Sequence, residues 1–234
     1  SALADQQDIF EIEYYDNPSW GINRGDAMEL ECNYLLMCDN LLDPTHVAWV
    51  HAGSFGQAAT KSAPLRVKKT NDGVIVHRWM MDVEPAPFYK KVVGFNGNCD
   101  RLQHYEVRYP SNALIKAIFT PAGTGGSEGK LHDDVFIMDS YNFMTPVTES
   151  KTRYYWFQLR NIRPDDSALS QLMTNDVQQA FEEDRNVLNE VQKGMTNKTS
   201  PHIDLPIDAG QLRFRRQLQA MINEEEQVDK QMAQ

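Results

Sequence analysis

Six segments of alternating apolar and polar residues fill the middle of this chain and limit the folds open to it. They are rich in Val, Ile, Tyr, Phe and Trp, and they cover residues 73–83, 91–95, 102–109, 113–120, 135–144 and 152–161. Alternation with a period of two predicts β-strands that bury one face. Because successive segments are joined by short connections, they favour an antiparallel meander over βαβ units.

Helical patterns flank this strand-rich region. Residues 40–51 have helix-like apolar spacing that ends at Gly53 and Gly56. Residues 165–193 and 208–226 read as two longer helices, with Gly194 as a stop between them. This order predicts an α+β fold in which a curved antiparallel sheet packs on a long C-terminal helix. We expect a cavity for an apolar ligand between the sheet and that helix.

Charge and cysteine content exclude several classes of protein. The chain has 23 Lys and Arg against 33 Asp and Glu, a net charge of −10, so we expect no nucleic acid partner. No apolar run approaches the roughly 20 residues of a membrane helix, and residues 1–13 do not resemble a signal peptide. Cys32, Cys38 and Cys99 are an odd and sparse set. A cytoplasmic protein with reduced thiols is the simplest interpretation.

Asp184 interrupts an apolar helical stripe. Val177, Phe181, Leu188 and Val191 follow helical spacing, and Asp184 lies on the same face. A carboxylate that points into a core costs several kcal/mol unless a cation or hydrogen-bond donors compensate it. A metal or catalytic role would explain this position. So would a buried ion pair, or a helix that is shallow at this point.

Two histidines lie among apolar residues near an acid. Asp43 precedes His46 by three residues, and His51 follows His46 by five. On a straight α-helix a step of five leaves the two rings roughly 140° apart, so they can share an ion only if the helix has a π-type bulge or breaks near Trp49. The alternative is a pair of core histidines with satisfied hydrogen bonds.

Together these residues form a possible metal site. Two neutral imidazoles and one carboxylate make the facial triad of non-haem Fe(II) oxygenases, although zinc accepts the same ligands. His46 and Asp184 are 184 − 46 = 138 positions apart. The site therefore requires that distant segments meet across the fold.

Residues 39–51 resemble the N-L-x-D-x-x-H-x-x-x-x-H signature of Rieske-type non-haem iron aromatic oxygenases, and are most similar to the vanillate O-demethylase oxygenase branch. Three further stretches match in the same order along nearly the whole chain: residues 145–156, residues 181–188, and residues 208–210 together with Arg215 and Arg216. The fold implied by this resemblance is a helix-grip fold, similar to that of Bet v 1 and START domains, which agrees with the predicted layout.

The resemblance also implies roles for individual residues. His46, His51 and Asp184 would bind a mononuclear Fe(II). Asp43 would hydrogen-bond a ligand histidine and bridge to the Rieske cluster of a neighbouring subunit, and Asn40 would lie beside the iron. The implied partners are O2, a small aromatic substrate, a separate reductase and, in the full-length enzyme, two further copies in a homotrimer.

Two departures from the family pattern matter. A Rieske [2Fe–2S] cluster is held by C-x-H and C-x-x-H pairs, and no cysteine here has a histidine at either spacing. We therefore expect residues 1–234 to be a single catalytic domain whose residues 1–5 resemble the segment after a Rieske domain. Such a domain would be inactive alone.

The second departure is Arg153, which stands where relatives often have histidine. Facing the pocket, its planar guanidinium would suit a carboxylate or sulfonate on the substrate. Alternatively, it faces solvent or pairs with Asp139 or Glu149. Strand alternation separates Arg153 from Tyr154 but does not say which face lines the cavity.

The sequence as a whole predicts the catalytic domain of a Rieske-type monooxygenase that O-demethylates or hydroxylates a small aromatic, anionic substrate. Two other interpretations remain open at this point. One is a zinc hydrolase on the same triad, with Asp43 as its only evident general base. The other is a metal-free helix-grip module that binds an aromatic or lipid ligand.

Overall fold

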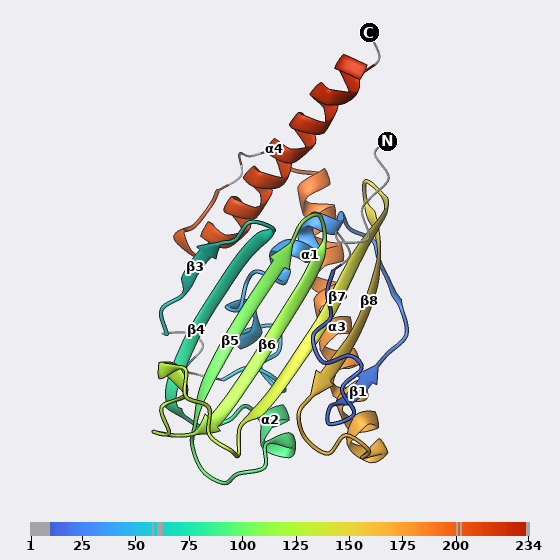
Figure 1. Cartoon of the computed structure of the whole chain (residues 1–234). Coiled ribbons are helices and arrows are strands. Elements are labelled where there is room, and N and C mark those ends of the chain that lie inside the picture. Colours follow the sequence, from blue (N-terminus) through green and yellow to red (C-terminus); the bar gives the residue numbers. More distant parts are fainter. Residues whose placement is uncertain (1–9, 58, 60–62, 200, 202, 233–234) are drawn as a thin grey trace.

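The computed structural model describes residues 10–57, 59, 63–199, 201 and 203–232, so the segment 1–5 lies outside the described residues. Antiparallel strands form one curved sheet in the order β1-β8-β7-β6-β5-β4-β3, with β2 also pairing with β8 (Figure 1). The strands are β1 (Gly21–Arg24), β2 (Met28–Leu30), β3 (Arg66–Lys69), β4 (Gly73–Val83), β5 (Cys99–Arg108), β6 (Asn112–Pro121), β7 (Phe136–Thr148) and β8 (Lys151–Arg160).

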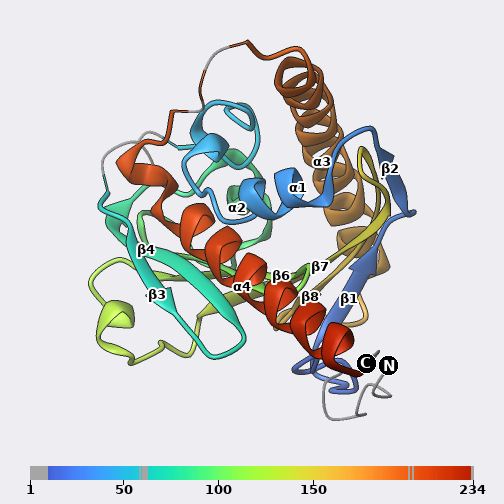
Figure 2. The ribbon, with the colours of Figure 1, turned by 90° about the horizontal axis from the view of Figure 1, so that it is seen from above.

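Helices cover one face of this sheet, as the view from above shows (Figure 2). They are α1 (Tyr34–Asn40), α2 (Pro87–Val92), α3 (Ser167–Thr196) and α4 (Ala209–Met232). Helix α3 contacts β1 and β2 at one edge of the sheet, and α4 contacts β3 and β4 at the other. The α+β, helix-grip prediction is confirmed.

Local sequence explains where the long helices begin and how closely they pack. The side chain of Asp166 caps α3 by accepting a hydrogen bond from the Leu169 N–H at 2.9 Å. In α4, a Cβ at Gly210 would lie 2.4 Å from Cγ2 of Val76, so only glycine allows the helix to approach β4 this closely. Arg215 fixes α4 to α1 through a two-pronged hydrogen bond to the Asp39 carboxylate.

The hydrophobic core lies between the sheet and the helices. From the sheet it takes the fully buried side chains of Phe119, Phe136 and Met144, and from α3 and α4 those of Met173 and Phe214. Each such side chain contributes about 1.5–3 kcal/mol when it leaves water. This core holds α3 at a fixed distance from the sheet and leaves room for a cavity beside it.

Five of the six predicted strand segments correspond to β4 through β8. The sixth, residues 91–95, is wrong because α2 occupies part of it. Pro87 stands at the start of this helix, where its missing N–H costs nothing, and Phe88, Tyr89 and Val92 form its buried face. The short strands β1 and β3 were not predicted.

Two expectations about α3 also need correction. Gly194 does not end the helix, which continues to Thr196, and Val191 is 40% exposed rather than inward-facing. The buried stripe consists of Leu169, Met173, Val177, Ala180, Asp184 and Leu188. Asp184 is thus the buried carboxylate that the apolar pattern predicted. Among the described residues, no helix is both long and apolar enough to cross a membrane.

Candidate metal centre

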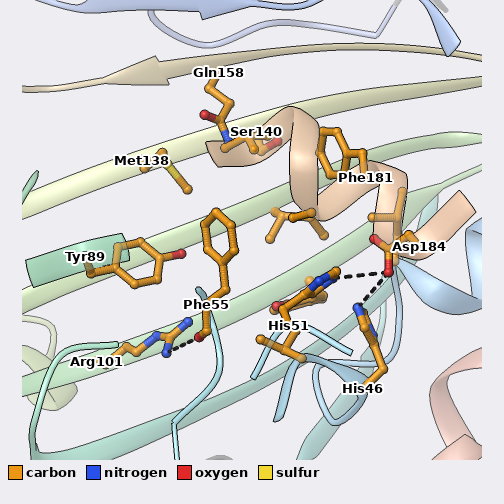
Figure 3. Close-up of a pocket in the computed structure, with 16 residues that line it drawn as sticks. His46, His51, Phe55, Tyr89, Arg101, Met138, Ser140, Gln158, Phe181 and Asp184 are labelled. Carbon is orange, nitrogen blue, oxygen red and sulfur yellow. Dashed lines mark hydrogen bonds and ion pairs between the residues drawn. The ribbon is translucent and has the colours of Figure 1, made fainter. Parts of the chain in front are cut away.

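Three side chains from two distant parts of the chain meet at one end of a cavity beside the sheet (Figure 3). His46 begins a short 3₁₀ helix (His46–Ala48), His51 follows shortly after, and Asp184 projects from α3. Oδ1 of Asp184 lies 3.6 Å from Nε2 of His46 and 3.1 Å from Nε2 of His51. One ligand atom from each residue lies within 4.8 Å of the other two. The residues expected to converge therefore do so.

A break in helical structure brings the two imidazoles together. Helix α1 ends at Asn40, and the 3₁₀ helix ends at Ala48, with Trp49 as its C-cap. The helix predicted over residues 40–51 is therefore wrong, and the chain has instead the break near Trp49 that two histidines five residues apart require. As a result, the ring centroids of His46 and His51 lie 5.2 Å apart, with the ring planes at 77°.

Each imidazole has its Nδ1 atom directed away from the centre. Nδ1 of His46 donates to the backbone carbonyl of Asp43, and Nδ1 of His51 donates to Oε2 of Glu183 at 2.7 Å. In a neutral ring Nε2 is then an acceptor, and both Nε2 atoms face the Asp184 carboxylate, which is also an acceptor. Three acceptors that face one another repel unless a proton or a cation lies between them.

The electrostatics of His51 reflect this crowding of acceptors. Burial lowers the pKa of His51, but the contacts with Asp184 and Glu183 and their negative charges outweigh it, so the pKa lies above the usual histidine value. A raised pKa favours a proton on the ring, in the place where a cation would bind. Oδ1 of Asp184 is buried, and apart from the two imidazoles it has no polar partner among the described residues.

The two distances from Asp184 to the histidines fit a single metal ion. Two ligand atoms that each lie about 2.1 Å from one ion are ~3.0 Å apart at a right angle and ~3.4 Å apart at the tetrahedral angle. The separations of 3.1 Å and 3.6 Å from Asp184 to the two histidines agree with these values to a few tenths of an ångström. Small side-chain movements would complete the coordination.

Asp43 contacts this centre through His46, and Asn40 precedes it at the end of α1. Asp43 contacts His46 through its backbone carbonyl rather than its carboxylate. The Asp43 carboxylate instead accepts hydrogen bonds from Thr45, from the backbone N–H at 2.7 Å and from the side-chain hydroxyl. Asn40 is the last residue of α1, and its Nδ2 atom is buried without a hydrogen-bond partner among the described residues. Neither Asp43 nor Asn40 lines the cavity.

The cavity next to the three residues has a volume of about 80 Å³. It lies between α3, the inner face of the sheet and the segment that follows α1, where a ligand cavity was expected. Arg101, Ser140 and Gln158 add polar atoms to its lining. Its apolar walls include Leu41, Val47, Ile115, Met138, Val177 and Phe181.

The expected pocket position of Arg153 is wrong. Its side chain is 47% exposed, forms an ion pair with Glu29 at 3.3 Å and lies over the ring of Tyr155. The reason is the alternation of β8: Tyr154 and Trp156, 1% and 4% exposed, point toward the helices, so Arg153 points to the opposite side. The alternative interpretation, a solvent-facing arginine, is the correct one.

Sequence reasoning missed two residues of the site. Glu183 was not singled out in the sequence, yet its carboxylate accepts a hydrogen bond from Nδ1 of His51. Arg101 was not considered because the predicted strand began at residue 102, three positions after the true start of β5 at Cys99. In β5, Cys99, Arg101 and Val107 are all buried and share one face, so alternation from Val107 backward would have placed Arg101 inside.

Comparison with known proteins agrees with this geometry. The family model described as "Vanillate O-demethylase oxygenase C-terminal domain" matches residues 30–224. The chain belongs to the vanillate O-demethylase oxygenase family. The resemblance to Rieske-type oxygenases that the sequence indicated is thereby confirmed.

Individual members of the family and of the fold can be compared in more detail. The vanillate O-demethylase oxygenase subunit of Pseudomonas sp. (strain ATCC 19151) is 31% identical over 99% of this chain and 72% of its own length. An iron-sulfur subunit of the toluene-4-sulfonate monooxygenase system of Comamonas testosteroni is 31% identical over 89% of this chain. Dicamba monooxygenase bound to 3,6-dichlorosalicylic acid has the same fold, with a TM-score of 0.84 and 21% identity over 95% of this chain.

This chain of the vanillate O-demethylase oxygenase family spans only part of these proteins. It covers 61% of the toluene-4-sulfonate subunit and 65% of the dicamba monooxygenase chain. The shared part includes the His46, His51 and Asp184 centre, which lies within the residues that the family model matches.

Proposed function

We propose that this chain is the catalytic domain of a Rieske-type non-haem iron monooxygenase that O-demethylates or hydroxylates a small aromatic substrate with O2. The observation that carries the proposal is the convergence of two imidazole Nε2 atoms and one buried carboxylate at the end of a mostly apolar cavity. Two histidines and one carboxylate with open positions are typical of non-haem Fe(II) oxygenases. One of the dicamba monooxygenase structures contains non-haem iron.

We assign His46, His51 and Asp184 as the ligands of a mononuclear Fe(II). Iron bound there would supply the activation of dioxygen. The protein contributes the geometry: the Asp43 carbonyl and the Glu183 carboxylate hold the two imidazoles with Nε2 toward the centre. The apolar walls of the cavity hold an aromatic ring against the metal and exclude water from it.

The electrons would come from a Rieske [2Fe–2S] cluster in a part of the protein outside this sequence, supplied by a separate reductase. We assign Asp43 as the residue that links His46 to the Rieske domain of a neighbouring subunit in a homotrimer. Asp43 is only partly buried, which supports this role because a bridging group must reach the surface. Asn40, whose buried Nδ2 atom has no hydrogen-bond partner in the described part of the chain, is proposed to lie beside the iron.

The test is metal binding by defined variants. We expect the chain, incubated with Fe(II) without oxygen and then desalted, to retain about one iron per molecule, as one facial triad requires. His46→Ala should retain none, whereas His132→Ala, which replaces an exposed loop histidine outside the site, should retain as much as the wild type. Iron content and thermal stability are measured on the same samples.

The other outcomes identify the competing functions. A chain that rejects iron but binds zinc through the same three residues would contradict the oxygenase and indicate a hydrolase. A metal-free chain that still binds aromatic ligands would indicate a binding module. We also expect iron-loaded chain with a reductase alone to form no sustained product, and steady turnover under those conditions would contradict the proposed need for a Rieske domain.

A further inference from the structure

Arg101 is a buried cation among aromatic rings. It lies on β5, is 1% exposed and lines the same cavity as the metal centre. Its guanidinium carbon lies 4.7 Å from the ring centroid of Tyr89 and 5.2 Å from that of Phe119. Contact with ring faces stabilises a cation only in part, because it does not satisfy the N–H donors.

The hydrogen bonds of Arg101 leave its charge uncompensated. Nη1 donates to two neutral oxygens, the Gln57 Oε1 at 2.5 Å and the Phe55 carbonyl at 3.4 Å. Nε is buried without a hydrogen-bond partner, and within the described parts of the chain no carboxylate forms an ion pair with this side chain. By contrast, Arg215 holds the Asp39 carboxylate with Nε and Nη2, at 3.0 Å and 2.5 Å. An isolated buried charge is costly, yet Arg160 is also fully buried and donates to two backbone carbonyls and a hydroxyl. Arg101 differs from Arg160 because Arg101 lines the cavity.

Arg101 and the metal centre lie at opposite ends of the cavity. In the close-up, His46, His51 and Asp184 are at one end, Arg101 and Tyr89 are at the other, and the Phe55 ring is between them (Figure 3). An aromatic ligand with an anion bound to Arg101 would direct the far side of its ring toward the centre. The Tyr89 hydroxyl also points into the space between the two ends.

We propose that Arg101 recognises the anionic group, a carboxylate or a sulfonate, of an aromatic substrate and so selects which end of the ring reaches the metal. Its fork of N–H donors matches the oxygens of either group. The role first considered for the exposed Arg153 is thus assigned to a buried residue on another strand. This inference rests on the proposed function, because it takes the cavity beside the metal centre as the substrate site.

The test compares matched ligands on the 234-residue chain. Calorimetry with 4-methoxybenzoate, 4-methylbenzenesulfonate and the neutral 4-methoxybenzamide should show that both anions bind at least about tenfold more tightly than the amide, as charge-assisted hydrogen bonds predict. Arg101→Met should lower the affinity for the anions by about 10–100-fold and leave that for the amide within about twofold. The affinity of Arg101→Lys for the anions should lie between those of the wild type and Arg101→Met. Lysine keeps the positive charge but lacks the planar fork of N–H donors.

Arg153→Met is the matched control, because it removes an arginine from the outer face of the same sheet; it should change neither affinity. Thermal unfolding of each variant shows whether it is folded. If Arg101→Met does not fold, a structure with 4-bromobenzoate decides: the carboxylate should lie within hydrogen-bond distance of Arg101, with the bromine toward the metal centre.

Three results would overturn the inference: equal affinity of the wild type for anions and amide, equal losses for both ligands in Arg101→Met, or a carboxylate bound away from Arg101. Iron content measured on the same preparations separates this inference from the proposed function. Iron binding without anion preference contradicts only the role of Arg101. Anion preference that depends on Arg101 in a chain that cannot bind iron contradicts only the oxygenase.

Discussion

Replacing Glu183 with glutamine should weaken iron binding by about tenfold. Glu183 accepts the Nδ1 proton of His51 at 2.7 Å, which fixes the tautomer and makes Nε2 a stronger ligand. Loss of such a supporting carboxylate typically costs 10–100-fold in metal affinity. The Glu183 side chain is 34% exposed, so solvent screens its charge and the lower end of that range, ~1.4 kcal/mol, applies. Glu183→Leu should lower the iron affinity further than Glu183→Gln does, because leucine also removes the hydrogen-bond acceptor for Nδ1 of His51.

The assay is a titration of metal-free chain with Fe(II) in the absence of oxygen, against a chelator of known affinity. Glu182→Gln is the control, because it makes the same chemical change one position earlier in α3. Glu182 pairs with Arg185 and with Gln178 on the same helix and does not contact the centre. Thermal unfolding of the metal-free variants separates an effect on the site from an effect on the fold.

The reasoning would be refuted by either of two results. One is an affinity of Glu183→Gln within about twofold of the wild type, well below the loss that such contacts normally cause. The other is an equal loss in Glu182→Gln, which would mean that overall negative charge on α3, and not the contact with His51, attracts the metal.

Three further predictions concern stability. In the metal-free chain, burial lowers the pKa of His51 but its two carboxylate neighbours raise it above the usual value. Stabilisation by the protonated ring should therefore be complete below about pH 6.5 and be lost as pH rises through the raised pKa. The wild type should melt at a higher temperature than His51→Gln at low pH, and this difference should become smaller as pH rises. Gly210→Ala should lower stability by about 1–3 kcal/mol, because the new Cβ meets Val76 at 2.4 Å; an unchanged denaturation midpoint would contradict this. Gly194→Ala, in the last turns of α3 with nothing within 4 Å, should raise stability by about 0.5–1 kcal/mol, and a loss in the same denaturation assay would show that the position is crowded.

The long elements were predictable from the sequence because their patterns are long. Strands β4 through β8 each show several cycles of alternation, and α3 shows several turns of apolar spacing. Residues 91–95 failed because a five-residue apolar segment fits a strand and a helix equally well. There the decision comes from Pro87, which starts a helix, and from the packing of Phe88 and Tyr89 into the core.

The site was predictable only in part, because residue type and spacing do not fix the direction of a side chain. Asp184 stood out as a charge within an apolar stripe, and the sequence required a break near Trp49 if the histidines were to meet. Which face of β8 carries Arg153 depends on where α3 packs, and this is set by contacts between distant residues. Arg101 lay outside the predicted strand, and only the observed β5 places it on the same buried face as Tyr105 and Val107.

The two carboxylates that hold His51 are neighbours in sequence. Glu183 contacts one nitrogen of the ring and Asp184 the other, and consecutive residues project about 100° apart around a helix. Helix α3 therefore cannot turn about its own axis without lengthening at least one of these contacts. A substitution that rotates or shifts the helix, even at Met173 about three turns away, would therefore change the contacts of His51 at the metal centre without any direct contact with it.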